Sequence, residues 1–422
     1  MVASPGFPGR ARGLRTHTTT EEREEVTLTE NVASALEGQV ASHLHPAGSF
    51  DVDSHPVPTG REEMWRFTPV KRLRGLHGDA AFEPGSTTLR WNTPDGVRVE
   101  IVDGAEARGL RGSSGLLPNT RFAARVLAEA PTTLLVDIPA DLEAHEPILV
   151  DLEGRDVATA EALDIVLRFG RHSRGVVVLN HTGSATVAQV VEVVVGDGAD
   201  ASVVSLQDWA DDAVHLTHQE ASVGRDASYK HVAISFGGDV VRMDSNVSYQ
   251  GPGGAAELFG LYFADAGQHL EHRLFVDHTA PRTRSDVVYK GALQGDGAHT
   301  VWVGNVLIRK VAEAIETYEQ NRNLVLTDGC RADSVPNLEI ETGEIEGAGH
   351  ASTTGRFDDE QLFYLQSRGI PEDEARRLVV HGFFNDIIRR IGVAGLEERL
   401  MATVEGELAK NVTQGAGQGR TA

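Results

Sequence analysis

The sequence predicts a mainly β protein with helical segments at both ends. Between about residues 132 and 350, short runs rich in β-branched and aromatic residues alternate with Gly, Asp and Asn, and no helical period of useful length interrupts them before about Lys310. Many short strands with few helices are typical of a sandwich, a barrel, a propeller or a β-solenoid. A solenoid suits so long a β region because it grows coil by coil. No clean repeat is present, however, and periodicity alone leaves the four architectures open.

Residues 1–131 precede the β region. Residues 1–22 are rich in Gly, Pro, Thr and Arg, which predicts a disordered tail. Residues 23–131 are expected to form a small, mainly helical domain with some strands. Helical spacing or composition indicates three helices in it, at Asn31–Val40, Arg61–Phe67 and Thr120–Ala128.

The central region, residues 132–352, is expected to be the β core. In Val241–Gln250 the residues alternate, so that one face of a strand is apolar and the other is polar. The apolar face consists of Val241, Met243, Val247 and Tyr249. The same alternation occurs at Val232, Ile234 and Phe236. Asp286–Leu293 and Thr300–Ile308 predict two further strands.

Residues 353–412 predict a helical domain. Asp358 and Gln361 fit a capping box in front of a short helix that ends at Gly369. Pro371 opens a longer helix that Gly392 closes. Apolar residues follow at four-residue steps in this helix and in the last one: Ala375, Val379, Phe383, Ile387 and Ile391, then Leu396, Leu400, Val404 and Leu408. The glycine-rich residues 413–422 predict a second disordered tail.

Composition excludes several classes of protein. The 39 Lys and Arg against 62 Asp and Glu give a net charge of −23, which argues against a surface that binds nucleic acid or anionic lipid. A single cysteine excludes an intrachain disulfide framework and fits a reducing cytosol. No apolar run approaches the roughly 18–20 residues of a membrane helix. The N-terminus lacks the apolar block of a secretory signal, so a transit peptide is the alternative to a tail. We therefore expect a cytoplasmic protein without nucleic-acid or membrane partners.

Common catalytic motifs are absent from the sequence. It contains no GxxxxGK[ST] phosphate loop, no GxGxxG and no GxSxG. The chain is therefore not expected to hydrolyse ATP through a Walker site. His145 and Glu146 do not form an HExxH zinc motif, because Leu149 occupies the fifth position.

Histidine is the abundant ligand type, with 17 copies. His269, His272 and His278 cluster in the sequence. Residues three apart on a strand point to opposite faces, so His269 and His272 make a poor chelate. Ordinary core and surface histidines are the preferred interpretation of this cluster.

Two single residues are better candidates for metal ligands. His350 lies in Gly347–Gly355, whose small residues leave the imidazole accessible to iron or zinc. Cys330 is a weaker candidate as a thiolate ligand, because a lone cysteine is more often a small buried apolar residue.

Asn321–Ile370 closely resembles the C-terminal signature of the SufB and SufD family, the scaffold proteins of iron–sulfur cluster assembly. The matching pieces are NLVLTDG, PNLEI at Pro336–Ile340, GHAS at Gly349–Ser352 and DDEQLFYLQSRGI. Upstream, His278–Leu293 matches the family's pattern of His, Pro, Ser and Tyr-Lys-Gly. Glu62–Pro69 (EEMWRFTP) resembles the N-terminal motif of the SufD branch. The resemblance covers most of residues 60–392.

The resemblance implies a right-handed parallel β-helix flanked by N-terminal and C-terminal helical domains. Together with the alternation, it predicts that Val232, Ile234 and Phe236 lie inside this β-helix. It implies a non-catalytic scaffold subunit of a SufB–SufC–SufD complex that assists iron acquisition and assembles iron–sulfur clusters for apo-proteins. The implied partners are a SufB-like scaffold and a SufC-like ABC ATPase, which hydrolyses the ATP. A transient cluster or iron at the SufB interface is implied, and reduced flavin is associated with the complex, with nothing bound tightly by this chain alone.

The resemblance also assigns residues. SufD-type chains carry a functional histidine before the QLFY helix, and His350 matches it, although the Cys that often precedes it is missing here. SufB-type chains have a cysteine where this chain has Leu365, which favours the SufD branch. The family's ATPase contact lies on the C-terminal helices, where an apolar stripe is expected to serve. The stripe consists of Phe383, Phe384, Ile387 and Ile388.

Two alternatives remain at this stage. One is a SufB-like scaffold role, against which Leu365 argues. The other is a β-helix enzyme that acts on polysaccharides. That function predicts secretion and aromatic sugar platforms, whereas aromatic residues make up only 6% of this chain.

Overall fold

A computed structural model describes residues 48–83, 85, 87–115, 117–357, 359–393 and 395–418. The chain divides into two units, Met1–Pro46 and Ala47–Ala422, and the described residues belong to the second. The predicted tail at residues 1–22 and the predicted helix at Asn31–Val40 therefore lie outside the described residues, as do residues 419–422 and Asp358 of the predicted capping box.

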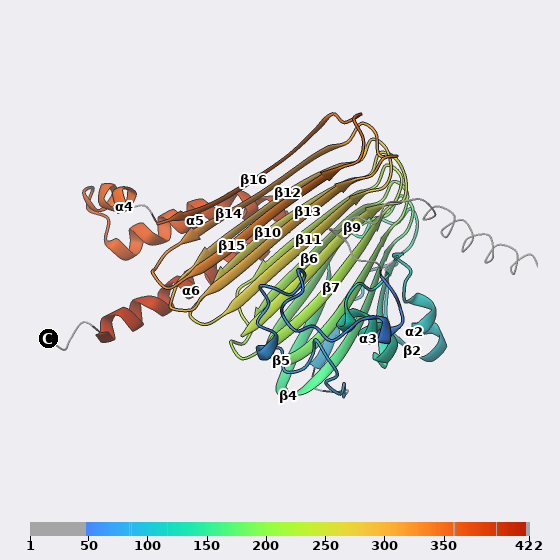
Figure 1. The fold of residues 1–422 in the computed structure, drawn as a ribbon, viewed down its shortest axis with the longest axis horizontal. Helices are drawn as coiled ribbons and strands as arrows, with labels where there is room; N and C mark the ends of the chain where they lie inside the picture. The colour runs from blue at the N-terminus through green and yellow to red at the C-terminus, as the bar shows by residue number, and fades with distance from the viewer. Residues whose placement is uncertain are drawn as a thin grey trace, which may run out of the picture. The chain divides into compact units, whose positions relative to one another are not determined.

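The described residues contain sixteen strands in one continuous sheet that is wound into a solenoid of about eight turns (Figure 1). The even-numbered strands from β6 to β16 stack on one side, and the odd-numbered strands from β7 to β15 stack on the other. The long strand β5 belongs to both sides, because Arg174–Gly183 pairs with β6 and Thr186–Val195 pairs with β7. The pairings among β3 to β16 are all parallel, whereas β1 pairs with β4 and β2 pairs with β3 in antiparallel fashion. The prediction of a mainly β protein with a parallel β-solenoid is therefore confirmed.

The elements have the following bounds. The strands are β1 (Thr87–Trp91), β2 (Arg98–Asp103), β3 (Thr132–Ile138), β4 (Ile148–Phe169), β5 (Arg174–Val195), β6 (Asp200–Trp209), β7 (Val214–Val223), β8 (Ser228–Ser235), β9 (Val240–Tyr249), β10 (Ala255–Ala264), β11 (His269–His278), β12 (Arg284–Leu293), β13 (His299–Ile308), β14 (Glu316–Val325), β15 (Arg331–Ile340) and β16 (Gly347–Arg356). The helices are the 3₁₀ turns η1 (Val52–Ser54) and η2 (Val70–Arg72), and α2 (Gly104–Leu110), α3 (Arg121–Glu129), α4 (Asp359–Gln366), α5 (Glu372–Ile391) and α6 (Leu396–Gln418).

Alternate residues of each strand fill the interior of the solenoid. The predicted apolar face of β9 lies there, as Val241, Met243, Val247 and Tyr249 belong to the main core. Two tyrosines are accommodated by glycines on the neighbouring strand: Tyr289 lies opposite Gly260, and Tyr262 lies opposite Gly291. A Cβ atom at either glycine would overlap the tyrosine ring. The two rings therefore fill space that only glycine leaves free.

Val232, Ile234 and Phe236 are buried, but the prediction that they lie inside the solenoid is wrong. They pack on its outer face, in a second core formed with the C-terminal helices. The inward positions of β8 are held instead by residues such as Tyr229 and Ala233. Alternation predicts the strand correctly but not its orientation, because both faces of β8 are buried.

Helices α5 and α6 cover this outer apolar face. Their apolar residues join the side chains of β6, β8, β10 and β12 in the second core. Lys290 ties α5 to the solenoid by donating to the Phe383 carbonyl at 2.7 Å and to Asp386 at 2.6 Å. Gly369 and Gly392 have φ angles of 85° and 68°, as expected for residues that end helices. Helix α6 continues into residues 413–418, part of the segment predicted as a tail.

The segment before β1 lies against the odd-numbered side of the solenoid. Arg61–Phe67 forms turns rather than the predicted helix, with i to i+3 hydrogen bonds at Trp65 and Thr68. Both residues contact the buried Arg242: its guanidinium lies 4.0 Å from the Trp65 ring centroid and donates to Thr68 Oγ1 at 2.9 Å. The EEMWRFTP motif thus serves to attach this segment to the strands. The helix predicted at Thr120–Ala128 is α3, and the Thr120 side chain caps its first turn.

Candidate functional site

His350 lies on β16, the last strand of the solenoid, and its side chain is exposed. In the parallel pairing with β14 it stands directly beside Glu319. Residues that are paired in register point to the same face of a parallel sheet, and Glu319 is an inward residue that is 1% exposed. His350 therefore belongs to the inward face, and it is exposed only because no further coil covers it among the described residues.

No further coil or helix of the described residues closes the solenoid at this end. In the described part of the chain, β15 pairs only with β13 and β16 pairs only with β14, so each has a free edge. A chain of hydrogen bonds crosses the opening: Ser352 donates to Ser334 at 2.7 Å, and Ser334 donates to Asn321 at 2.7 Å. Two unpaired ten-residue edges beside an exposed interior are a surface that proteins usually cover.

Glu319 lies inside the solenoid, one rung below His350. Both of its carboxyl oxygens are buried and have no hydrogen-bond partner among the described residues. Burial raises the pKa of Glu319 to about 8, so the side chain holds its proton at neutral pH. Oε1 lies 2.8 Å from the position that a Cβ atom on Gly304 would occupy, so the acid reaches across the interior to the opposite sheet.

Cys330 precedes β15 and lies apart from His350. Its thiol is partly buried and donates to the Gly295 carbonyl at 3.2 Å, and burial raises its pKa, which disfavours the thiolate. The chain reverses between β15 and β16, and Ser334 meets Ser352, so Cys330 lies towards the Arg356 end of β16. No group of three or more His, Cys, Asp or Glu side chains suited to a metal ion occurs within the described ranges.

The other sequence-predicted histidines have structural partners. His269 and His272 point to opposite faces, as predicted, and each is buried. His272 stacks on Tyr262 inside the solenoid, with ring centroids 5.0 Å apart. His269 lies outside it, 3.1 Å from both Glu271 and His299. His278 contacts Thr283 at 2.7 Å and thereby closes the turn before β12.

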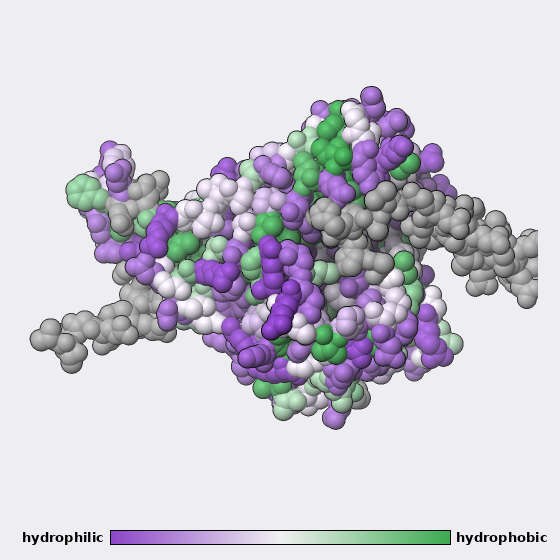
Figure 2. All heavy atoms as spheres, viewed as in Figure 1, coloured by the Kyte–Doolittle hydropathy of each residue, from purple (hydrophilic) through white to green (hydrophobic). Residues whose placement is uncertain are grey.

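The predicted ATPase-contact stripe is buried within this chain. Phe384 and Ile387 are fully buried and Ile388 is 2% exposed, all in the core between α5, α6 and the solenoid, while Phe383 is partly buried beside them. The apolar residues that the C-terminal helices do expose are different ones: Phe363 (71%), Tyr364 (54%) and Leu378 (47%). Elsewhere, on the face viewed in Figure 2, apolar residues form small patches separated by hydrophilic ones.

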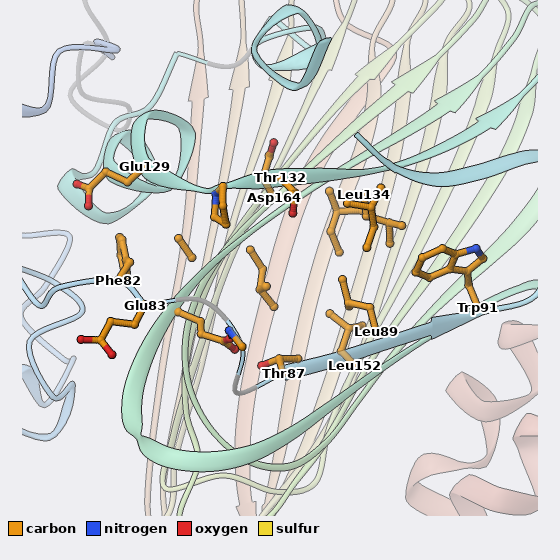
Figure 3. Close-up of a pocket in the computed structure, with 17 residues that line it drawn as sticks. Phe82, Glu83, Thr87, Leu89, Trp91, Glu129, Thr132, Leu134, Leu152 and Asp164 are labelled. Carbon is orange, nitrogen blue, oxygen red and sulfur yellow. The ribbon is translucent and has the colours of Figure 1, made fainter. Parts of the chain in front are cut away.

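A cavity of about 350 Å³ lies near the first coil, far along the strand order from His350 (Figure 3). Leu89, Leu134 and Trp91 line one part of it, and the carboxylates of Glu83 and Glu129 lie at the other. It contains none of the site residues predicted from the sequence. None of the described helices is long and apolar enough to span a bilayer.

Sequence reasoning missed two residues that matter here. Lys290, the Lys of the Tyr-Lys-Gly motif, holds α5 in place, so the motif is explained by packing. No sequence motif marks Glu319, because its position beside His350 is seen only when β14 and β16 are aligned.

Comparison with known proteins gives a consistent result. Residues 152–383 match the family model of the SUF system FeS cluster assembly SufBD core domain. An iron–sulfur cluster assembly SufBD family protein of Mycobacterium tuberculosis is 51% identical over 383 residues, which cover 89% of this chain and 96% of the relative. One of Mycobacterium leprae is 50% identical over 384 residues, covering 89% and 97%. A second SufBD family protein of M. tuberculosis is 27% identical over 250 residues, covering 59% of this chain and 28% of that relative.

Proposed function

The chain belongs to the SufBD family of iron–sulfur cluster assembly proteins, and from that premise we propose that it is a SufD-type scaffold subunit. In this proposal it pairs with a SufB-like scaffold through the open end of its solenoid and works with a SufC-like ABC ATPase. It helps to supply iron to a cluster that is assembled at the interface and passed to apo-proteins. The cluster is transient cargo, and reduced flavin, if used, binds through the complex.

The open end is the observation that carries the proposal. Among the described residues, β15 and β16 each have a free edge, and the two edges flank an interior that the final coil leaves uncovered. A second solenoid with matching edges would continue both sheets and bury His350 between the two subunits. A buried imidazole at such a junction can bind iron together with ligands from the partner, since one protein ligand alone holds a metal weakly.

One further observation favours the SufD-type role over the SufB-like alternative. Position 365 is Leu rather than Cys, and Leu365 packs beside the small core of α4 and α5.

We place the ATPase contact on the exposed residues of α4 and α5. Phe363, Tyr364 and Leu378 are large apolar residues with about half or more of their surface exposed. Exposed aromatic residues of this kind are typical anchors of protein interfaces. The buried stripe around Phe384 would instead hold these helices against the solenoid.

The test is co-expression with a SufB-type scaffold and an ABC ATPase of the same genome, followed by affinity purification. Wild-type chain should retain both partners and yield cluster on reconstitution with iron and sulfide. His350→Ala should preserve the complex but reduce the cluster yield, whereas His145→Ala, at an exposed histidine 83% accessible in its side chain, should not. Phe363→Ser with Tyr364→Ser should release only the ATPase. Failure of the wild-type chain to retain a SufB-type partner at micromolar concentration would reject the proposal.

A further inference from the structure

We infer that Glu319 and His350 together form a two-ligand site for a divalent metal ion, Fe²⁺ being the physiological candidate, at the open end of the solenoid. The inference rests on the proposed function and extends it. It adds to His350 a second ligand from the same chain, which neither a motif nor the family resemblance indicates.

Register brings the two side chains together. Glu319 and His350 are direct partners in the parallel pairing of β14 and β16, and both belong to the inward face. Neighbouring strands are about 4.8 Å apart. A carboxylate oxygen and an imidazole nitrogen that share one ion lie about 3 Å apart, at bond lengths of roughly 2.0–2.2 Å. Side chains as long as Glu and His bridge that span when they start one strand apart.

The unpartnered state of Glu319 is the second observation. The structure gives other deeply buried acids a partner: Glu271 has Arg242 and Arg273, Glu192 has Ser114 and the Gly112 amide, and Asp164 has Arg111. Glu319 is as deeply buried, yet both of its oxygens have none in the described part of the chain. Buried carboxyl groups are normally hydrogen-bonded, paired or bound to metal. A cation at the opening would displace the Glu319 proton into solvent and supply the missing partner.

The residues around His350 are small. Across the interior, Gly304 has no side chain, and the Trp302 ring and the Glu319 carboxyl group fill the space beside it. In β16, Ala348 and Ser352 flank His350 on the inward face, since they pair with Thr317 and Asn321.

The ligand set defines the ion class. One carboxylate with one imidazole suits Fe²⁺, Mn²⁺ or Zn²⁺ rather than the soft Cu⁺. No third suitable side chain joins the pair in the described residues. Water or the partner scaffold must complete the coordination, so binding by the chain alone is expected to be weak and binding in the complex tighter.

The experiment titrates the full-length purified chain with Co²⁺, whose visible absorption reports nitrogen and oxygen ligands, and repeats the titration anaerobically with Fe²⁺. Glu319→Gln keeps the shape of the side chain but removes the anionic ligand. Glu316→Gln is the matched control, because Glu316 lies on the same strand with its side chain 52% exposed and paired with Arg284. Thermal melting of each variant verifies folding, and Glu319→Asp, which shortens the reach, provides a second test.

Glu319→Gln and His350→Ala should each weaken Co²⁺ binding by at least about tenfold, since even an outer-shell partner contributes 10–100-fold. The double variant should weaken binding by less than the product of the two single losses, because both residues hold one ion. Unchanged binding by Glu319→Gln, with weakened binding by His350→Ala, would overturn this inference and leave the proposed function intact. Unchanged binding by both variants would overturn the inference and remove His350 as a metal ligand as well.

Discussion

Replacing Glu319 by Gln should change how the stability of the metal-free chain depends on pH. The folded state holds the Glu319 proton until about pH 8, because burial raises its pKa from 4.5 to about 8. The unfolded chain releases that proton above pH 4.5. Between these values the unfolded state binds fewer protons, so the free energy of unfolding falls as the pH rises. Gln carries no proton to lose, and the variant should therefore lack this decline.

The magnitude follows from the pKa shift. One pKa unit corresponds to 1.36 kcal/mol, so the full shift of Glu319 destabilises the folded state by about 5 kcal/mol above pH 8. Between pH 5 and pH 8 the change is about 3–4 kcal/mol. With an unfolding entropy of about 2.1 cal/mol/K per residue, that equals a difference in melting temperature of about 4 °C for a chain of 422 residues.

The assay is differential scanning calorimetry of wild type, Glu319→Gln and Glu316→Gln at pH 5, 6, 7 and 8, with a chelator present. The melting temperature of Glu319→Gln should rise relative to wild type by about 4 °C as the pH increases from 5 to 8. Glu316→Gln should follow wild type, because Glu316 is exposed. Parallel curves for wild type and Glu319→Gln would refute the reasoning, since they would mean that Glu319 does not titrate differently on folding.

Three further substitutions test the packing. Phe384→Ala should lower the free energy of unfolding by about 3–5 kcal/mol, because the ring is fully buried between α5 and the solenoid; a loss below 1 kcal/mol in urea titration would contradict that placement. Gly291→Ala should destabilise by about 1–3 kcal/mol, since its Cβ would overlap the Tyr262 ring, whereas Gly355→Ala, which meets open space, should be nearly neutral in the same titration. Lys290→Met should raise the rate at which limited proteolysis cleaves the link before α5, because it removes both hydrogen bonds from Lys290 to α5. An unchanged cleavage rate would show that apolar packing alone holds the helix.

The strands could be predicted from the sequence, but the side to which they point could not. Alternation correctly marked β9, whose apolar residues Val241 and Met243 lie in the interior. The same signal at Val232 and Ile234 assigned the wrong face, because the helices α5 and α6 bury the outer surface of β8 as well. Apolar residues at every second position show that one face of a strand is apolar. They identify the face that points into the interior only when the other face is polar.

The register of the solenoid was likewise beyond sequence reasoning. Partners on successive rungs are 26 residues apart at Val214 and Val240, and 32 apart at Arg284 and Glu316. Because the length of a coil varies, no fixed repeat appears in the sequence. The offset of 31 residues that sets Glu319 beside His350 could therefore not be read from it. His350 was found through the family resemblance and small neighbours, and Glu319 needed the fold.

In a solenoid, the inward side chains of each coil pack against those of the neighbouring coils, and this explains both the family motifs and the candidate site. Each coil is covered by the next, so the motif residues Tyr289 and Gly291 are explained by the neighbours Gly260 and Tyr262 on the preceding strand. No described coil follows β16, so its inward residues have only one neighbouring coil within the described chain. His350 is exposed for this reason, and Glu319, one rung below, lacks the partner that a further coil or a bound ion would supply. Binding chemistry is therefore expected where the stacking ends, while the family motifs along the solenoid are explained by packing within the fold.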